Sequence, residues 1–176
     1  MKKSIFLSIV IALISTVAFA YEQEDLDKLR TTKICAQKFG YRDTACDLSE
    51  ADLTNAKLIG AELYGAYLVK ANLTNANLGA ANLSSVNLTF AKVRNANLKH
   101  ADLGHAKLTG ADLSGADLSY ADLCKADLTG ANLRDAKIDS AIFLEAKLCN
   151  TVMPDGQRIF HDCFRIIDTA KASCQY

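Results

Sequence analysis

The sequence has no charge imbalance, almost no proline and none of the short motifs that mark common active sites. Its 176 residues include no tryptophan and a single proline, Pro154, and its twenty basic residues are balanced by twenty acidic ones. A neutral chain neither attracts nor mimics a polyanion, so the composition does not favour a nucleic-acid partner. The sequence also lacks a Cys-x-x-Cys pair, a glycine-rich phosphate-binding loop and a Gly-x-Ser-x-Gly motif. We therefore expect no enzymatic activity and no cofactor.

The one long apolar run lies at the N-terminus, from Ile5 to Val17. Lys2 and Lys3 precede it, and residues 18–20 follow it with the small-x-small pattern of a signal peptidase site. The run is shorter than the ~20 apolar residues that span a bilayer, and no cysteine directly follows it that could carry a lipid anchor. We therefore expect residues 1–20 to be a cleaved signal peptide. The mature chain, with a net charge of −2, should be periplasmic, or extracellular as second choice, without stable membrane insertion.

A five-residue unit close to Ala-(Asp/Asn)-Leu-x-x repeats from Cys46 onward. Taking every fifth residue from Leu48 to Met153 gives twenty-two centres, of which eighteen are leucine and the others are Val93, Ile138, Phe143 and Met153. The residue two positions before the centre is alanine in nineteen of these repeats, the exceptions being Cys46, Val86 and Thr151. Such regularity is a sequence signature of a solenoid.

The period of five fits neither of the common secondary structures. On an α-helix each step of five residues advances about 140°, so the leucines would spiral around the rod. On a flat strand an odd period would direct every second leucine into water. The conflict disappears if the backbone turns a corner once per repeat, with the central leucine and its alanine directed inward. Four corners then close a square coil of twenty residues.

The repeats resemble the pentapeptide-repeat family, as in the stretches Ala111–Gly115 (ADLSG) and Ala116–Tyr120 (ADLSY). The resemblance covers Cys46 to about Asp155 and implies an all-β solenoid, a right-handed quadrilateral β-helix. The segment Thr151–Gly156 is also similar to the way such arrays end. The resemblance implies little about function.

Both flanks are predicted to cap the column, because a terminal coil exposes unpaired backbone groups and apolar side chains. The predicted organisation is residues 1–20 as signal peptide, 21–45 as N-terminal cap, 46–155 as β-helix and 156–176 as C-terminal helical cap. Residues 22–38 fit a short helix. Apolar residues at helical spacing predict an amphipathic helix over residues 158–168, acting as a lid on the last coil. A membrane or partner surface is the alternative for that apolar stripe.

Two groups of polar residues invite a catalytic or metal-binding interpretation, and the repeat argues against both. The aspartates 112, 117, 122 and 127 precede four successive centres, so each should lie on a different side of the coil. His100 and His105 lie on adjacent sides, and His161 belongs to the C-terminal cap, so the sequence predicts no metal site. Outward apolar positions in the first coils are better candidates, as part of a surface that binds another protein or that the N-terminal cap covers. They are Ile59, Tyr64, Tyr67, Val69 and Phe90.

Six cysteines in an exported chain predict disulfide bonds. Cys124 and Cys149 each follow a centre, so they should point outward from adjacent walls, beyond the ~7 Å between α-carbons that a disulfide allows. We therefore predict that they bond to Cys163 and Cys174, in either order. Cys35 is predicted to bond to Cys46. A local Cys163–Cys174 loop is the alternative if the C-terminal helix ends early.

Two functions from different classes remain. The first is a rigid, non-enzymatic scaffold or interaction module in the cell envelope, a monomer or weak dimer whose partner is another protein. The alternative is a DNA mimic similar to the pentapeptide-repeat proteins that protect DNA gyrase. Residues 46–153 carry twelve acidic and ten basic residues, which is far from the acidic column that such mimicry requires. A binding or hydrolytic site within the caps is a third reading.

Overall fold

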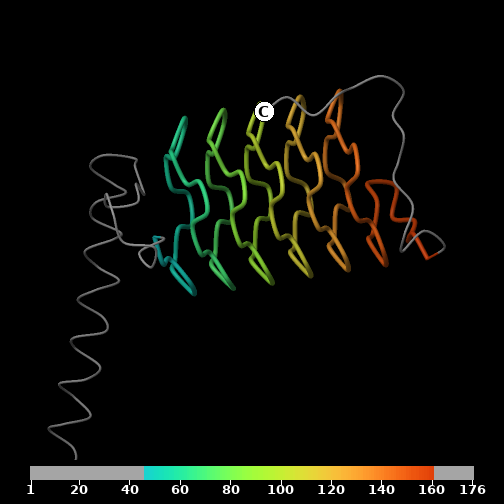
Figure 1. The fold of residues 1–176 in the computed structure, drawn as a ribbon, viewed down its shortest axis with the longest axis horizontal. Coiled ribbons are helices and arrows are strands. Elements are labelled where there is room, and N and C mark those ends of the chain that lie inside the picture. Colours follow the sequence, from blue (N-terminus) through green and yellow to red (C-terminus); the bar gives the residue numbers. More distant parts are fainter. Residues whose placement is uncertain (1–45, 161–176) are drawn as a thin grey trace, which may run out of the picture.

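A computed structural model describes residues 46–160, which wind into a four-sided β-helix (Figure 1). Its β structure consists of single-residue bridges separated by turns. The described residues contain no helix and no strand longer than one residue. Parallel bridges join each residue before a centre to the residue twenty positions later, from Asp47 with Tyr67 to Asn132 with Val152. The predicted coil of twenty residues is confirmed.

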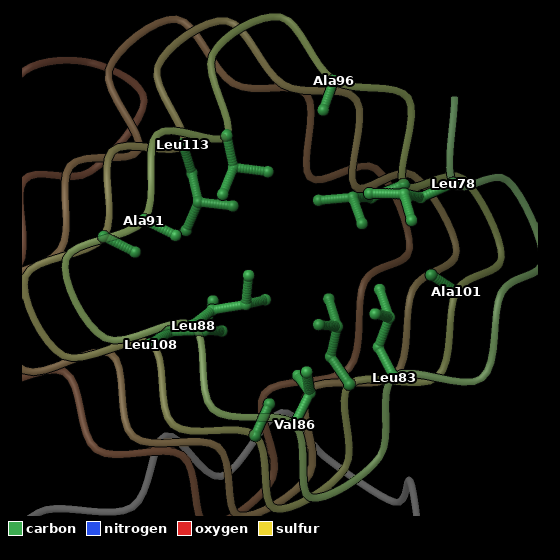
Figure 2. Packing of buried hydrophobic residues seen from close by; sticks show 14 of the residues in the cluster. Leu78, Leu83, Val86, Leu88, Ala91, Ala96, Ala101, Leu108 and Leu113 are labelled. Atoms are coloured by element: carbon green, nitrogen blue, oxygen red, sulfur yellow. The ribbon is translucent and has the colours of Figure 1, made fainter. Parts of the chain in front are cut away.

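The four sides of the column are named here by the centres that line them. Wall A holds the centres 48, 68, 88, 108, 128 and 148, wall B those at 53, 73, 93, 113, 133 and 153, wall C those at 58, 78, 98, 118 and 138, and wall D those at 63, 83, 103, 123 and 143. Figure 2 shows labelled leucines from all four walls directed into the interior.

The interior is filled by the two residue types that the repeat conserves along the chain. The central leucines of the middle coils and the alanines two positions before them are almost completely buried. Two of the exceptions also fit: Val86 is fully buried, and the buried hydroxyl of Thr151 donates a hydrogen bond to the Leu128 carbonyl at 2.7 Å. The predicted inward direction of both positions is confirmed.

The backbone amides of one repeat show why the residue before the leucine is usually Asp or Asn. In residues 86–90 the first amide donates across the corner to the Leu83 carbonyl, and the second, third and fifth donate to neighbouring coils at 2.7–3.0 Å. The fourth, that of Thr89, donates instead to Oδ1 of Asn87 at 3.1 Å. Every amide of the repeat therefore donates a hydrogen bond. The Asn or Asp side chain accepts from the one amide that has no acceptor in a neighbouring coil or across the corner.

This bond recurs along the column and changes the acidity of the carboxylates that accept it. The hydroxyl and the amide of Ser119 both donate to Asp117, and these two hydrogen bonds hold the pKa of Asp117 below its usual value. Thr54 lowers the pKa of Asp52 in the same way. The repeated aspartates are therefore structural acceptors.

Each corner depends on a residue in the left-handed backbone region. All repeats from the one that ends at Glu50 to the one that ends at Asn150 have a φ between +53° and +70° at their last residue. Glycine occupies only some of these positions, and Phe90 and Tyr120 adopt the same conformation with φ values of 57° and 61°. Corners therefore do not require small residues, and the side chains of Phe90 and Tyr120 are accommodated there with 60% and 53% exposure.

At two corners, those of Gly110 and Gly115, an added Cβ atom would collide with the side chain of the corner residue one coil earlier, Phe90 or Asn95. A Cβ atom on Gly110 would lie 2.5 Å from Cε1 of Phe90, the corner residue one coil earlier. A Cβ atom on Gly60, which has a similar φ of +63°, would meet nothing within 4 Å. Phe90 thus lies across the space that Gly110 leaves open.

The C-terminal end of the described chain closes the ladder with a reversal. After Met153 the chain turns and runs back antiparallel, with Val152 bridged to Arg158. Asn150 and Met153, whose amides would otherwise face a missing coil, donate to the carbonyls of Ile159 and Gln157 at 2.8 and 2.7 Å. Residues 158–160 are therefore extended, and the prediction that a helix begins at residue 158 is wrong for these three residues.

Several predictions concern residues outside the described range. They are the signal peptide (1–20), the N-terminal cap with its helix (21–45), and the C-terminal helix beyond residue 160. Within residues 46–160, no helix is long and apolar enough to span a bilayer.

Replacing a buried centre by aspartate should unfold the column. In Leu98→Asp a carboxylate enters the fully buried interior without a partner, at a cost of about 3–5 kcal/mol. In Asn95→Asp the same group is added at an exposed corner, and stability should change by about 0.5 kcal/mol or less. Urea unfolding followed by circular dichroism compares them. Equal losses would show that the inward and outward positions are misassigned.

Substituting corner glycines should separate backbone strain from steric conflict. Gly60→Ala places a side chain in the left-handed region and should cost about 1–2 kcal/mol. Gly110→Ala has the same cost and also collides with Phe90, so it should be the more destabilising. Combining it with Phe90→Ala should reduce its cost to that of Gly60→Ala in a double-mutant cycle. No coupling in that cycle would contradict the contact.

The lowered pKa of Asp117 predicts a loss of stability in acid. A carboxylate whose pKa is depressed by folding stabilises the protein above its unfolded pKa, and this contribution is lost as the pH falls through the folded pKa. Asp117→Asn keeps an acceptor oxygen but does not titrate. Urea unfolding at neutral and acidic pH should therefore show a smaller pH-dependent loss for Asp117→Asn than for the wild type. Identical losses would exclude this carboxylate as a source of acid sensitivity.

Candidate interaction surfaces

The five predicted interaction residues do not form one patch. Ile59 lies on wall C, Tyr64 on wall D, Tyr67 and Val69 on wall A, and Phe90 at the corner between walls A and B. Ile59, Tyr64, Tyr67 and Phe90 are 47–60% exposed, whereas Val69 is half-buried. The structure therefore brings only Tyr67, Val69 and Phe90 to one side of the column, and it leaves Ile59 and Tyr64 around the corner.

A second aromatic site, which the sequence analysis missed, lies at the corner between walls C and D. Tyr120 is 53% exposed, and its ring stacks on that of His100, with centroids 4.9 Å apart and planes 15° from parallel. The ammonium group of Lys99 lies 5.6 Å from the centroid of the Tyr120 ring. The sequence signal that could have revealed this site is the separation of twenty residues between His100 and Tyr120, because residues twenty apart are stacked in adjacent coils.

Wall D carries a hollow of about 550 Å³ on its outer face. The described residues that line it include three stacked positions that each follow a centre, Ser84, Gly104 and Cys124. The complete set of described lining residues is Tyr64, Ser84, Ser85, Asp102, Gly104, His105, Asp122 and Cys124. Ser84, Ser85 and Gly104 have small side chains or none, so little protrudes from the outer face of wall D at the hollow.

A cysteine, a histidine and two aspartates in one hollow are the side chains of a thiol nucleophile with its base. Cys124 is disulfide-bonded, however, so it has no thiolate to offer. Oδ1 of Asp102 and of Asp122 each accepts a backbone amide, from Gly104 and Cys124, at 2.8 Å. The arrangement therefore has the composition of a catalytic site without an available nucleophile.

The three described cysteines are all disulfide-bonded. Cys46 begins the first repeat, and Cys149 is half-buried on wall A. Cys124 follows its centre and lines the outer hollow, as the outward assignment predicts, yet it is only 1% exposed. Its burial is compatible with the predicted participation of Cys124 in a disulfide. Cys35, Cys163 and Cys174 lie outside the described residues, and the predicted pairings stay predictions.

The other polar candidates are distributed as the repeat requires. The aspartates 112, 117, 122 and 127 lie on walls B, C, D and A in turn, and each accepts the amide two residues later at 2.8–3.1 Å. His100 and His105 lie at successive corners, and His161 is outside the described range. Among residues 46–160, no group of three or more His, Cys, Asp or Glu residues is placed to hold a metal ion.

Comparisons with known proteins agree with this architecture. The family model for pentapeptide repeats matches residues 46–84, 81–119 and 116–153, whereas no curated protein matches the chain. Among solved structures, HetL, a protein involved in the regulation of heterocyst differentiation in the cyanobacterium Nostoc sp. strain PCC 7120, is 35% identical, with a TM-score of 0.36. The alignment covers 64% of this chain and 60% of HetL.

Two further solved structures are similar over a comparable part of the chain. A pentapeptide repeat protein from the thylakoid lumen of Arabidopsis thaliana is 30% identical, with a TM-score of 0.44, and the alignment covers 51% of this chain and 66% of that one. QnrB1, a plasmid-mediated fluoroquinolone resistance protein, is 23% identical, with a TM-score of 0.39 and coverages of 61% and 60%. The matched part thus spans less than two thirds of each of these proteins. From the family model and the coil of twenty residues, we conclude that the chain belongs to the pentapeptide repeat family, whose members form right-handed quadrilateral β-helices.

Proposed function

We propose that the chain is an exported, non-enzymatic pentapeptide repeat protein that acts as a rigid scaffold or protein-interaction module in the cell envelope. The observation that carries the proposal is the presence of large exposed aromatic side chains on a column whose interior is filled. Phe90 and Tyr120 are 60% and 53% exposed and are held by corners with defined backbone geometry. Rigid aromatic side chains lose little conformational entropy when they bind, and they are enriched among the residues that dominate protein interfaces.

The composition of the described surface supports a protein partner over a nucleic acid. Basic and acidic residues lie next to one another in adjacent coils, as in the pair Lys92 and Asp112 on wall B and the series Lys107, Asp127 and Lys147 on wall A. Neighbouring coils pair these charges, with Lys147 lying 3.8 Å from Asp127 and Arg94 donating to Asp112. A surface that neutralises itself in this way presents neither a basic track for phosphates nor the acidic column that DNA mimicry needs.

Export is supported by the sequence of residues 1–20 and by the disulfide-bonded state of the three described cysteines. Disulfides persist in oxidising compartments and are rare in the cytosol. A rigid solenoid held by disulfides is suited to a role in the envelope.

Site-specific crosslinking in the native envelope tests the proposal. A photoreactive amino acid at Tyr120 or Phe90 should capture one defined protein, and the same group at Asn75, an exposed corner with a similar φ of 58°, should not. With the captured protein purified, Tyr120→Ser or Phe90→Ser should weaken binding at least about ten-fold, as expected for an interface anchor. The proposal is excluded if all three positions give the same background of crosslinks. Potent inhibition of purified DNA gyrase in a supercoiling assay would instead favour the DNA-mimic alternative.

A further inference from the structure

Two exposed aromatic sites lie at diagonally opposite corners of the column, in the third coil (86–105) and the fourth (106–125). Phe90 occupies the corner between walls A and B in the third coil. His100 and Tyr120 occupy the corner between walls C and D in the third and fourth coils. Because walls A, B, C and D follow one another around the coil, these two corners face in opposite directions (Figure 2).

The rings at the two corners span the same height of the column. The Phe90 ring reaches the fourth coil, because its Cε1 atom lies 2.5 Å from the position of a Cβ atom on Gly110. The rings of His100 and Tyr120 are stacked with centroids 4.9 Å apart, which matches the spacing of ~4.8 Å between coils. The stack therefore runs along the column, and the edges of its rings point outward. An outward edge suits a T-shaped contact with the face of another aromatic ring.

The formal charges around the two sites have opposite signs. In the third and fourth coils, walls A and B with their corner comprise residues 86–94 and 106–114, and walls C and D with their corner comprise 96–104 and 116–124. The charged residues of the first set are Lys92, Arg94, Lys107 and Asp112. Those of the second set are Lys99, Asp102, Asp117 and Asp122. Three bases and one acid give +2 around Phe90, whereas one base and three acids give −2 around Tyr120.

Two of the basic side chains around Phe90 have no ion pair among the described residues. Arg94 donates to Asp112, whereas Lys92 on wall B and Lys107 on wall A are exposed on either side of the Phe90 corner. An acidic surface that carries an aromatic ring complements such a corner. The chain itself presents a surface of this kind at the corner of Tyr120.

We propose that the corner of Phe90 in one copy of the chain binds the corner of His100 and Tyr120 in a second copy. The two surfaces differ, so the contact is heterologous, and because they face in opposite directions each added copy leaves one binding corner available. Columns thus associate side by side in an open row. A contact between two corners is small, so the association of each pair is weak. The inference rests on the function proposed above, because it uses the same aromatic side chains, and it identifies their partner as a second copy.

Analytical ultracentrifugation of the purified chain, with its disulfides intact, tests the contact. Between about 10 µM and 1 mM the weight-average mass should rise without a plateau at the dimer, as expected for weak, open association. Phe90→Ser and Tyr120→Ser should each weaken the association at least about ten-fold. A wild-type chain that remains monomeric over this range would overturn the inference.

Asn75→Ser is the matched control, because Asn75 is an exposed corner residue with a similar φ of 58°. It should leave the association unchanged. Circular dichroism should show that all three variants keep the fold, since each replaced side chain is exposed. If the two aromatic substitutions weakened association no more than Asn75→Ser, the assigned corners would be wrong.

Mixing the two aromatic variants distinguishes this contact from a symmetric one. Phe90→Ser keeps the corner of Tyr120, and Tyr120→Ser keeps the corner of Phe90, so an equimolar mixture should form a 1:1 dimer that neither variant forms alone. Each copy in that dimer has already used its one intact corner, so the mass should not exceed twice that of the monomer. A mixture that sediments as the sum of its two components would refute the heterologous contact.

Charge reversal tests the contribution of the lysines beside Phe90. Lys92→Glu should weaken association about three- to five-fold, and high salt should weaken the association of the wild type. Lys57→Glu makes the same charge change at an exposed position of the first coil and should not weaken it. Equal effects of the two substitutions would contradict the charge complementarity.

The crosslinking experiment separates this inference from the proposed function. Photoreactive groups at Phe90 and Tyr120 should link the chain to a second copy of itself, and this product supports the inference. If they capture only a different protein while the purified chain remains monomeric, self-association is refuted and the role as an interaction module stands.

Discussion

The stacking of backbone amides between coils is the constraint on which the rest of the column depends. In a repeat that lies between two other coils, three amides donate to those coils and one closes a corner, as residues 86–90 show. This pattern requires a coil of twenty residues, a left-handed residue at every corner and an acceptor for the fourth amide. Asn or Asp supplies that acceptor from within the same repeat, so a single five-residue unit satisfies its own turn while leaving the other amides free to join the coils.

The same constraint explains why side chains that could bind a partner lie only on the outer surface of the column. Leucine and alanine fill the interior, and the aspartates that could have served as acids or bases accept backbone amides. Variation is left to the positions that follow each centre and to the corners, where Phe90, Tyr120 and the small residues of wall D occur. A polar hollow of this kind arises by stacking residues twenty apart. The side chains that line such a hollow can therefore differ without disturbing the hydrogen bonds between the coils.

The ends of the column pose a problem that the repeat cannot solve by itself. A last coil leaves amides without acceptors, and such an edge invites pairing with another chain. Here the reversal after Met153 supplies carbonyls from Gln157 and Ile159 to the exposed amides. The same turn therefore protects the edge of the last coil and brings Ile159 beside Asn150.

The sequence by itself determined the coil, its four walls and the inward residues, because a strict period of five allows only one way to bury Leu88 and its equivalents. It did not determine the corner conformation or the role of Asn87, since both depend on which amides the neighbouring coils leave unpaired. The contact of His100 with Tyr120 and the hollow around Gly104 and Cys124 were likewise decided by the tertiary structure. Side-chain contacts between coils join residues that are twenty positions apart. Whether an outward residue is exposed depends on what packs over it. A local sequence pattern contains neither kind of information.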